Sequence, residues 1–332
     1  MRTLIFTLSL FISSFSFSQS NNRFSLTGPA QGTSFSITYF HPSEIFTLAT
    51  ADSIFRSVDS SLSIYNPSSL ISRFNKGNDP VPLDQHLSSV IRKALETYRL
   101  TGGAFDITIK PLMDAWGLGA NGQAGPSPDS NTIHKILECI GSDKLMITDS
   151  LLVKLKPCIQ IDVNGIAQGY TVDLLAQYLD KLGVNNYIIE LGGEIKVKGN
   201  KPGGKPFTVG IEMPSDDLLL PPMIQQHLQL DSGAITTSGS YRKFIESNGK
   251  KINHIFDPKT GNSYQGNVLS VTVYAADAIT ADAFDNALLL MPLKESLAFV
   301  EDHQELAAYF IYTDNNGIIK GKASNRFKSL MK

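Results

Sequence analysis

Residues 161–183 read IDVNGIAQGYTVDLLAQYLDKLG and join the end of an apolar strand to a long helix. Apolar side chains recur there at the spacing of one helix face, and Gly183 follows the last of them. The recurring positions are Ile166, Tyr170, Leu174, Leu175, Tyr178, Leu179 and Leu182. This pattern predicts an amphipathic helix over residues 166–182 that ends at the glycine.

The segments after this helix are mostly short and rich in strand-forming residues. Strands are predicted over residues 186–191, 194–199, 206–212, 226–231, 234–237 and 267–275. Helices are predicted over 281–291 and 293–302, before a last strand near 306–312. Because short turns join several of these strands, antiparallel pairing is favoured.

The segments before the central helix add one strand and two helices. A strand is predicted over 33–40, and helices over 44–62 and 84–100, the second with Asp84 as its N-cap. Residues 117–130 are rich in Gly, Pro, Asn and Ser and predict a surface loop. Helices and strands thus mix without a strict β-α-β alternation. The sequence predicts a fold of the α+β class, with one large mixed or antiparallel sheet and flanking helices, over residues 22–332.

Residues 1–18 have the features of a secretory signal peptide. Arg2 precedes a short apolar run, and small residues spaced one apart precede Gln19. The run is shorter than the roughly 20 residues that span a membrane. We therefore expect cleavage after Ser18 and export to the periplasm. The alternative is a retained anchor, which would associate the protein with the inner membrane.

The composition is that of a folded globular protein, with 42% hydrophobic and 18% charged residues. The formal net charge is −2 and Lys and Arg are not clustered, which argues against a nucleic-acid partner because such binding depends on a basic patch. The two cysteines, Cys139 and Cys158, lie outside any metal-binding or redox pattern. They form one disulfide in an oxidising compartment, or they are two buried thiols.

The first candidate site is the segment Asp282-Ala283-Phe284-Asp285-Asn286. On a helix, positions 282, 285 and 286 share one face, and three oxygen-bearing side chains there suit a hard cation such as Mg²⁺. The alternative is that aspartates in the first turn of a helix complement its dipole. Apolar residues on both sides imply burial, and two buried carboxylates need a counter-charge, which favours the metal.

The second candidate site is the start of the central helix. Here a strand end runs through Asp162 and Asn164 into the helix, where free backbone N–H groups can hold an anion. Gly165 and Gly169 would let a ligand approach the backbone closely. The alternative is an ordinary turn with Asn164 as N-cap.

Three weaker patterns complete the candidates. Residues 101–106 form a glycine hinge before a strand, and residues 235–240 place small hydroxyl residues at a strand end, where they either cradle phosphate or form a turn. His254 precedes the turn Asp257-Pro258-Lys259-Thr260-Gly261 and is a candidate general base, although a lone histidine is more often structural.

Taken together and in this order, the segments resemble the ApbE family, the FAD:protein FMN transferases. The matching segments span about residues 24–312 and are highly specific as an ordered set. They are 31–33, 62–65, 72–75, 103–106, 162–170, 191–194, 237–239, 254–261 and 282–286.

The resemblance implies a compact α+β fold, and it implies a role for each matching position. The residues that would line the FAD are Gln31, Tyr65, Ala104, Phe105, Asp106, Asp162, Gln168 and Phe256. The residues that would hold Mg²⁺ are Asp282, Asp285, Asn286 and Gly165, the last through its carbonyl. A threonine hydroxyl of an acceptor protein would attack the phosphorus on the riboflavin side of FAD, and AMP would leave.

The chain departs from the family pattern at three of these positions. Gln31 stands where methionine is common, Gln168 where lysine or glutamate is frequent, and Asn286 where threonine is usual. An amide oxygen can still bind Mg²⁺, so the metal site is expected to be weaker but present.

Two further functions are compatible with the same residues. One is an FAD pyrophosphatase that releases FMN and AMP, and the other is a non-catalytic periplasmic flavin-binding protein. A protein that only binds flavin would not need a general base or metal ligands. The chain keeps His254 as candidate base, Asp285 as the alternative candidate base and Asp282 as a metal ligand, which argues against a protein that only binds flavin. The family implies that the acceptors are exported subunits of electron-transport systems.

Overall fold

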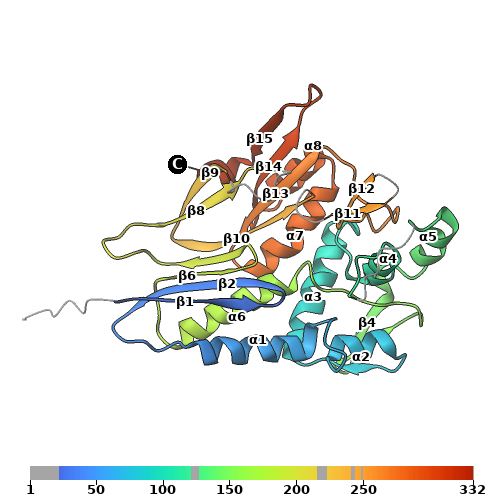
Figure 1. Cartoon of the computed structure of the whole chain (residues 1–332), viewed down its shortest axis with the longest axis horizontal. Helices are drawn as coiled ribbons and strands as arrows, with labels where there is room; N and C mark the ends of the chain where they lie inside the picture. The colour runs from blue at the N-terminus through green and yellow to red at the C-terminus, as the bar shows by residue number, and fades with distance from the viewer. Residues whose placement is uncertain (1–21, 121–126, 215–222, 241–243, 248–249, 332) are drawn as a thin grey trace, which may run out of the picture.

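A sheet of eight antiparallel strands runs through the centre of the protein, as the computed structural model shows (Figure 1). The structure describes residues 22–120, 127–214, 223–240, 244–247 and 250–331. The strands lie in the order β1-β2-β6-β7-β10-β13-β14-β15. Their bounds are β1 (Asn22–Ala30), β2 (Thr33–His41), β6 (Tyr187–Leu191), β7 (Glu194–Lys198), β10 (Ser232–Gly239), β13 (Val268–Ala275), β14 (Ala307–Thr313) and β15 (Ile319–Ala323).

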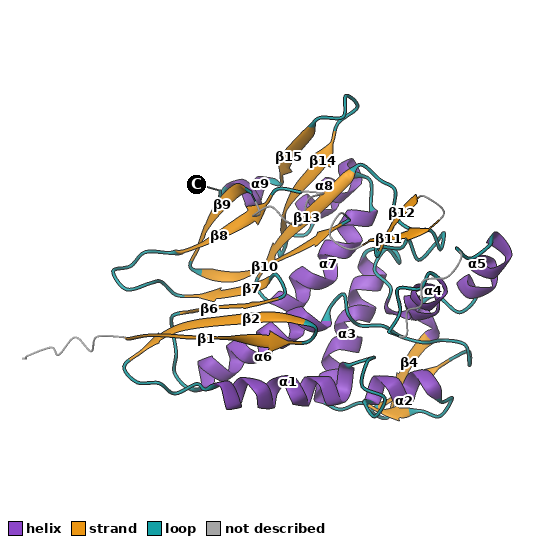
Figure 2. Ribbon diagram, viewed as in Figure 1, coloured by secondary structure: helices purple, strands orange, loops and turns teal. Residues whose placement is uncertain are grey.

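One face of this sheet is covered by helices (Figure 2). Helix α1 (Leu48–Leu62) and helix α6 (Ala167–Lys181) pack on β2 and β6, and helix α7 (Ala278–Leu290) and helix α8 (Leu293–Asp302) pack on β13 and β14. The opposite face carries the hairpin of β8 (Phe207–Glu212) and β9 (Ile224–Leu230), together with helix α9 (Asn325–Lys328). The alternating strand residues therefore enter two separate cores.

A second, helix-rich region packs against α6 and α7 at one end of the sheet. It contains α2 (Leu70–Lys76), β3 (Val81–Pro82), α3 (Gln85–Leu100), α4 (Lys110–Ala115), α5 (Ser130–Leu137), β4 (Leu145–Thr148), β5 (Leu151–Lys154), two short 3-10 turns and the hairpin β11 (Phe244–Ser247)–β12 (Lys250–Asn253). Its main core includes Val163, Ile166 and Tyr170 from the start of α6 and Ala283 and Ala287 of α7. The helices α6 and α7 are therefore shared by both halves.

The structure confirms the α+β class and the central helix, and it corrects several boundaries. Asp84 caps α3 as predicted, its carboxylate accepting from the Leu87 N–H. Helix α7 begins three residues earlier than predicted because Asp277 caps it through the Thr280 N–H. The strand over 306–312 is not the last one, because β15 pairs with it. Strand β1 was not predicted at all.

Membrane association of the N-terminus lies outside what the structure tests. Residues 1–18, the predicted signal peptide, are not among the described residues. Among those that are described, no helix combines the length and the apolar character needed to span a bilayer.

Cys139 and Cys158 form a disulfide, which settles the alternative left open by the sequence. Cys139 follows α5, and Cys158 stands four residues after the end of β5 at Lys154. The strand end predicted before Asp162 is wrong, because residues 159–163 belong to neither a helix nor a strand. The bond closes a loop with a sequence separation of 19 residues. It therefore fixes both flanks of the β4–β5 hairpin to each other.

Removing this bond with the double substitution Cys139→Ser/Cys158→Ser is expected to lower the free energy of unfolding by about 3 kcal/mol, as for other loops of this size. Urea denaturation followed by far-UV circular dichroism measures the change. Wild-type protein treated with dithiothreitol is the control and should lose a similar amount. Equal stability of oxidised and reduced wild type would contradict the prediction.

Candidate functional site

The backbones of α6 and α7 touch at Gly169. A Cβ atom at this position would lie 2.4 Å from the Ala278 carbonyl oxygen and 2.7 Å from Cβ of Asp282. The Gly169 N–H donates to Oδ2 of Asp282 at 2.8 Å. Only glycine allows this approach, which brings the second candidate segment against the first.

The Asp282 carboxylate caps the N-terminus of α6, and it does not lie in the first turn of its own helix, α7. The first turn of α7 contains no acidic residue, so the dipole alternative for this segment is wrong. The N-cap of α6 is Ile166, which makes no capping side-chain bond, and the Asn164 N–H donates instead to Asp162. The alternative with Asn164 as N-cap is therefore wrong as well. The anion held at the positive end of α6 is the Asp282 carboxylate.

The Asp282 and Asp285 carboxylates are buried, with 4% and 2% of each residue exposed. Burial raises the pKa of Asp282 to about 7. The hydrogen bond from the Gly169 N–H lowers this pKa in part, and the negative charge of Asp173 raises it further. Burial, followed by the charge of Asp282, raises the pKa of Asp285 well above its usual range. Oδ1 of Asp285 has no hydrogen-bond partner within the described part of the chain. Such a pair gains most from a cation.

Asn286 and Gly165 lie beside this pair. A Cβ on Gly165 would stand 3.0 Å from Nδ2 of Asn286 and 3.7 Å from a ring carbon of Phe105. Oδ1 of Asn286 accepts from the Ser238 hydroxyl at 2.8 Å. No group of three His, Cys, Asp or Glu residues in the described ranges could hold a metal. The set with two carboxylates, an amide and a carbonyl is nevertheless one that a hard cation uses, so the residues fit Mg²⁺.

Strand β10 contributes two hydroxyl side chains to the site, from the segment 235–240 that the sequence singled out as a weaker candidate. Thr236 and Ser238 point to the α7 side of β10, where they contact Asp285 and Asn286, and are 0% and 8% exposed. Polar side chains at alternate positions of a buried strand were the available signal. From the next strand, the charge of Glu194, a residue that is 9% exposed, further raises the pKa of Asp285.

Gln168 and Gln31 occupy the same end of the sheet. A Cβ on Gly192 would lie 2.9 Å from Nε2 of Gln168 and 3.2 Å from a carboxylate oxygen of Glu194. Gln31 lies in the β1–β2 turn with φ 50°, and its Nε2 donates to Asp59 and Thr171. The structure thus places Gln168 beside the β6–β7 turn and Gln31 against α1 and α6, and their contacts with FAD stay predictions.

The other predicted FAD contacts are more dispersed. Phe105 reaches Gly165, next to the half-buried Ala104, and Asp162 is buried with its pKa raised to about 6 mainly by burial. Tyr65 is 66% exposed at the end of α1. Phe256 packs in a separate small core, 5.5 Å from the Trp116 ring. Their roles stay predictions.

The Asp106 carboxylate is occupied by local structure. Oδ1 accepts from the Thr108 N–H, the Thr108 hydroxyl and the Ser142 hydroxyl at 2.8, 2.6 and 2.6 Å. Oδ2 accepts from the Ser142 N–H at 3.2 Å. These four hydrogen bonds show that the Asp106 side chain stabilises the loop conformation. A contact between Asp106 and FAD stays a prediction.

His254 lies in the bend that follows β12 and is half-buried. Its neighbour Asn253 is fixed by two bonds: its Nδ2 donates to the Tyr264 carbonyl at 2.7 Å, and its carbonyl accepts from the Ser263 hydroxyl at 3.2 Å. The predicted turn after it is present, with Gly261 N–H bonded to the Asp257 carbonyl. The backbone around His254 is therefore well held.

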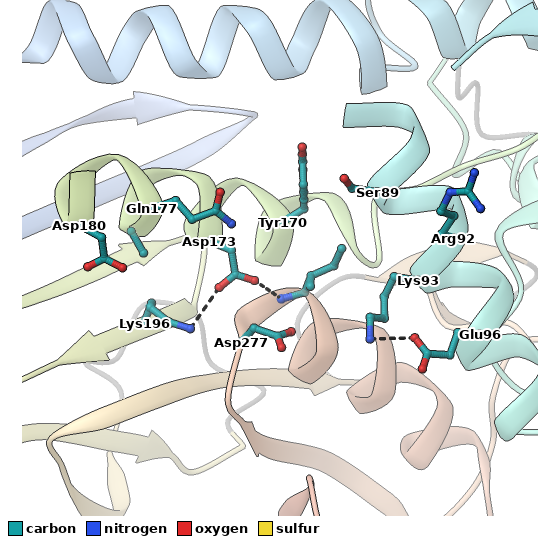
Figure 3. Close-up of a pocket in the computed structure, with 12 residues that line it drawn as sticks. Ser89, Arg92, Lys93, Glu96, Tyr170, Asp173, Gln177, Asp180, Lys196 and Asp277 are labelled. Atoms are coloured by element: carbon teal, nitrogen blue, oxygen red, sulfur yellow. Dashed lines mark hydrogen bonds and ion pairs between the residues drawn. The ribbon is translucent and has the colours of Figure 1, made fainter. Parts of the chain in front are cut away.

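A cavity of about 500 Å³ lies between α3, α6, β7 and the start of α7 (Figure 3). Asp173 crosses it, pairing with Lys196 at 3.3 Å and accepting from the Ala278 and Ile279 N–H groups at 3.0 and 2.9 Å. None of the predicted site residues lines it. The charged side chains around the cavity form the ion pairs Lys93–Glu96 and Lys196–Asp173. The contacts of Asp173 fix the start of α7 on α6.

Comparison with known proteins shows the family of this chain. The ApbE family model matches residues 31–310. The FAD:protein FMN transferase of Vibrio cholerae is 33% identical over 312 residues, which are 92% of each chain, and that of Haemophilus influenzae is 31% identical over 92% of this chain and 91% of its own.

Solved structures agree in fold. The flavin transferase ApbE from Vibrio cholerae superposes with a TM-score of 0.83 at 30% identity, over 93% of this chain and 99% of that one. The apo flavinyl transferase ApbE of Pseudomonas stutzeri gives a TM-score of 0.84 at 28% identity, over 94% and 97%. The family match covers far more than half of the chain, and so the chain belongs to the ApbE family.

Proposed function

We propose that this protein transfers FMN from FAD to a threonine of an acceptor protein, with release of AMP, and that it requires Mg²⁺. The observation that carries the proposal is the buried pair Asp282 and Asp285 at the α6–α7 contact, which forms no salt bridge with a basic side chain in the described part of the chain. Relatives that are 31–33% identical are named FAD:protein FMN transferase. A cation site of this kind suits an enzyme that cleaves a pyrophosphate, because a bound cation neutralises the negative charge of the phosphates.

The chemistry divides between the two candidate segments and His254. The threonine oxygen forms a bond to the phosphorus on the riboflavin side, the bond from that phosphorus to the bridging oxygen breaks, and AMP leaves with the electron pair. The hydroxyl proton goes to the ring of His254. This is a substitution at phosphorus in which positioning and charge neutralisation supply most of the rate.

The residues that would hold Mg²⁺ are Asp282, Asp285, Asn286 and the carbonyl of Gly165. A bound Mg²⁺ neutralises charge on the pyrophosphate oxygens. Asp282 keeps its orientation through Gly169, and Ser238 orients the Asn286 amide. Gln168 and Gln31 would bind polar groups of FAD, as the resemblance to the family implies.

The proposed setting is the periplasm, and the proposed acceptors are exported subunits of electron-transport systems. The signal-like residues 1–18 and the disulfide support an oxidising compartment. Retention of the signal would place the same domain at the inner membrane.

Incubation with FAD, Mg²⁺ and a threonine-containing acceptor domain tests the proposal. The acceptor should gain the mass of FMN less one water, AMP should appear in equal amount, and EDTA should stop both. Release of FMN and AMP without any acceptor adduct would favour the pyrophosphatase. Tight FAD binding without AMP would favour a flavin-binding protein.

Mg²⁺ affinity is expected to fall as the pH drops through about 7. Burial raises the folded pKa of Asp282 to about 7 from 3.8, so protons compete with the metal below that value. In the metal-free protein the sign is opposite: the stability due to protonated Asp282 is complete below about pH 4 and lost as the pH rises through 7. Thermal melts at about pH 6 and pH 8, with Mg²⁺ or EDTA, should show the larger Mg²⁺ stabilisation at the higher pH. Equal Mg²⁺ stabilisation at both would contradict this.

A further inference from the structure

A second cavity, of about 400 Å³, lies on the face of the sheet away from α7. One wall is residues 209–212 of β8, and the other is formed by β6, β7 and β10. Ile235 and Thr237 of β10 line it, whereas Ser238 of the same strand contacts Asn286 on the opposite face. We call this cavity the β8 groove.

The β8 groove runs along the edge of β8. Side chains alternate along a strand, and here Val209 and Ile211 are buried in the core beneath the hairpin while Gly210 is exposed. All three nevertheless line the same cavity, as expected for a cavity that runs along the backbone at the strand's edge. Across the described residues, β8 pairs in the sheet with β9 alone. Its second edge can therefore receive another extended chain.

One end of the groove reaches the candidate active site. Gly192 and Gly193 of the β6–β7 turn line it together with Thr33. Gly192 stands against Gln168, and the residue after Gly193 is Glu194, whose charge acts on Asp285. A chain lying in the groove would thus reach the glycine turn that borders Gln168 and Glu194.

We infer that the β8 groove binds the acceptor polypeptide, as an extended segment alongside β8 with its threonine at the Gly192–Gly193 turn. The inference rests on the proposed function. Two carboxylates, Glu190 and Glu212, line the groove, so it disfavours acidic side chains next to the threonine. The Glu190 carboxylate also accepts from the Gly193 N–H at 3.0 Å, which fixes the conformation of the turn.

The test uses the full-length protein with FAD, Mg²⁺ and three synthetic decapeptides. Each has one central threonine, flanked by Ala and Ser, by Asp or by Lys, and FMN adducts are counted by mass spectrometry. Glu212→Arg should raise labelling of the Asp peptide relative to the Lys peptide by about tenfold or more. Thr208→Arg is the matched control, because Thr208 is exposed on β8 but does not line the groove. It should leave the ratio unchanged.

FAD affinity, measured by flavin fluorescence, shows whether each variant is folded, and Glu212→Gln replaces Glu212→Arg if the latter is not. An unchanged peptide ratio in a folded Glu212 variant, with peptides labelled normally, overturns the groove and leaves the transferase standing. Labelling of no threonine peptide while AMP is released overturns transfer itself, and with it the groove.

Discussion

Asp285→Asn is expected to lower the rate of FMN transfer by about 10³-fold while making the metal-free protein more stable at neutral pH. The rate falls because one carboxylate of the proposed Mg²⁺ site is lost, and such a ligand contributes several kcal/mol. Stability rises because the folded protein holds Asp285 with a strongly raised pKa, whereas the unfolded chain releases its proton freely.

The gain in stability has a definite pH dependence. It should be near zero at about pH 3, below the unfolded pKa of 3.8, where the carboxyl is mostly protonated in both states. It should grow as the pH rises to 7, to about 2–4 °C or more in melting temperature. Melts in EDTA and transfer assays in Mg²⁺ measure the two effects. Asp302→Asn, at an exposed position ending α8, is the control for both. An active Asp285→Asn enzyme would remove the metal hypothesis.

His254→Ala is expected to lower the transfer rate by about 10²-fold or more, within the usual range for loss of a general base. FAD affinity should change little, because the surrounding backbone is held by Asn253 and the turn at Gly261. Release of AMP in the presence of FAD, Mg²⁺ and the acceptor measures the rate, and flavin fluorescence measures the affinity.

A matched control is His303→Ala. His303 stacks on Phe299 just after α8, outside the candidate site, and should leave transfer unchanged. If His254→Ala turns over normally and merely binds FAD less tightly, His254 is a binding residue. The base would then be sought at Asp285, although a metal-bound carboxylate is less basic.

The central helix and most strands could be predicted because their burial is one-sided and leaves a clear period in the sequence. Strand β1 left no such trace. Of its nine residues only Leu26 is buried, and Gly28 and Pro29 interrupt it, as an edge strand tolerates. Strand β15 is almost wholly exposed and exists because β14 offers it a partner.

The candidate site shows a similar division. The helical spacing of 282, 285 and 286 predicted one face, and the structure brings that face to Gly165 and Gly169. Spacing along one helix could not show that Asp282 caps α6, because that contact depends on how two helices approach. Nor could it separate Asp106, which holds a loop, or Phe256, which packs on Trp116, from residues that point to the carboxylate pair.

The contact between Gly169 and Asp282 has a consequence for how the chain folds. These residues are 113 positions apart, and β2 must find β6 over a comparable distance, with Phe35 opposite Leu191. Such a high contact order predicts slow folding, since long loops must close before any of these pairs forms. In a chain that ends before residue 278, the N–H groups at the start of α6 would lose the Asp282 carboxylate, and the surface of α6 that packs on α7 would be exposed. The capacity to hold a metal should therefore appear late in refolding, together with the docking of α7 and not with the formation of α6.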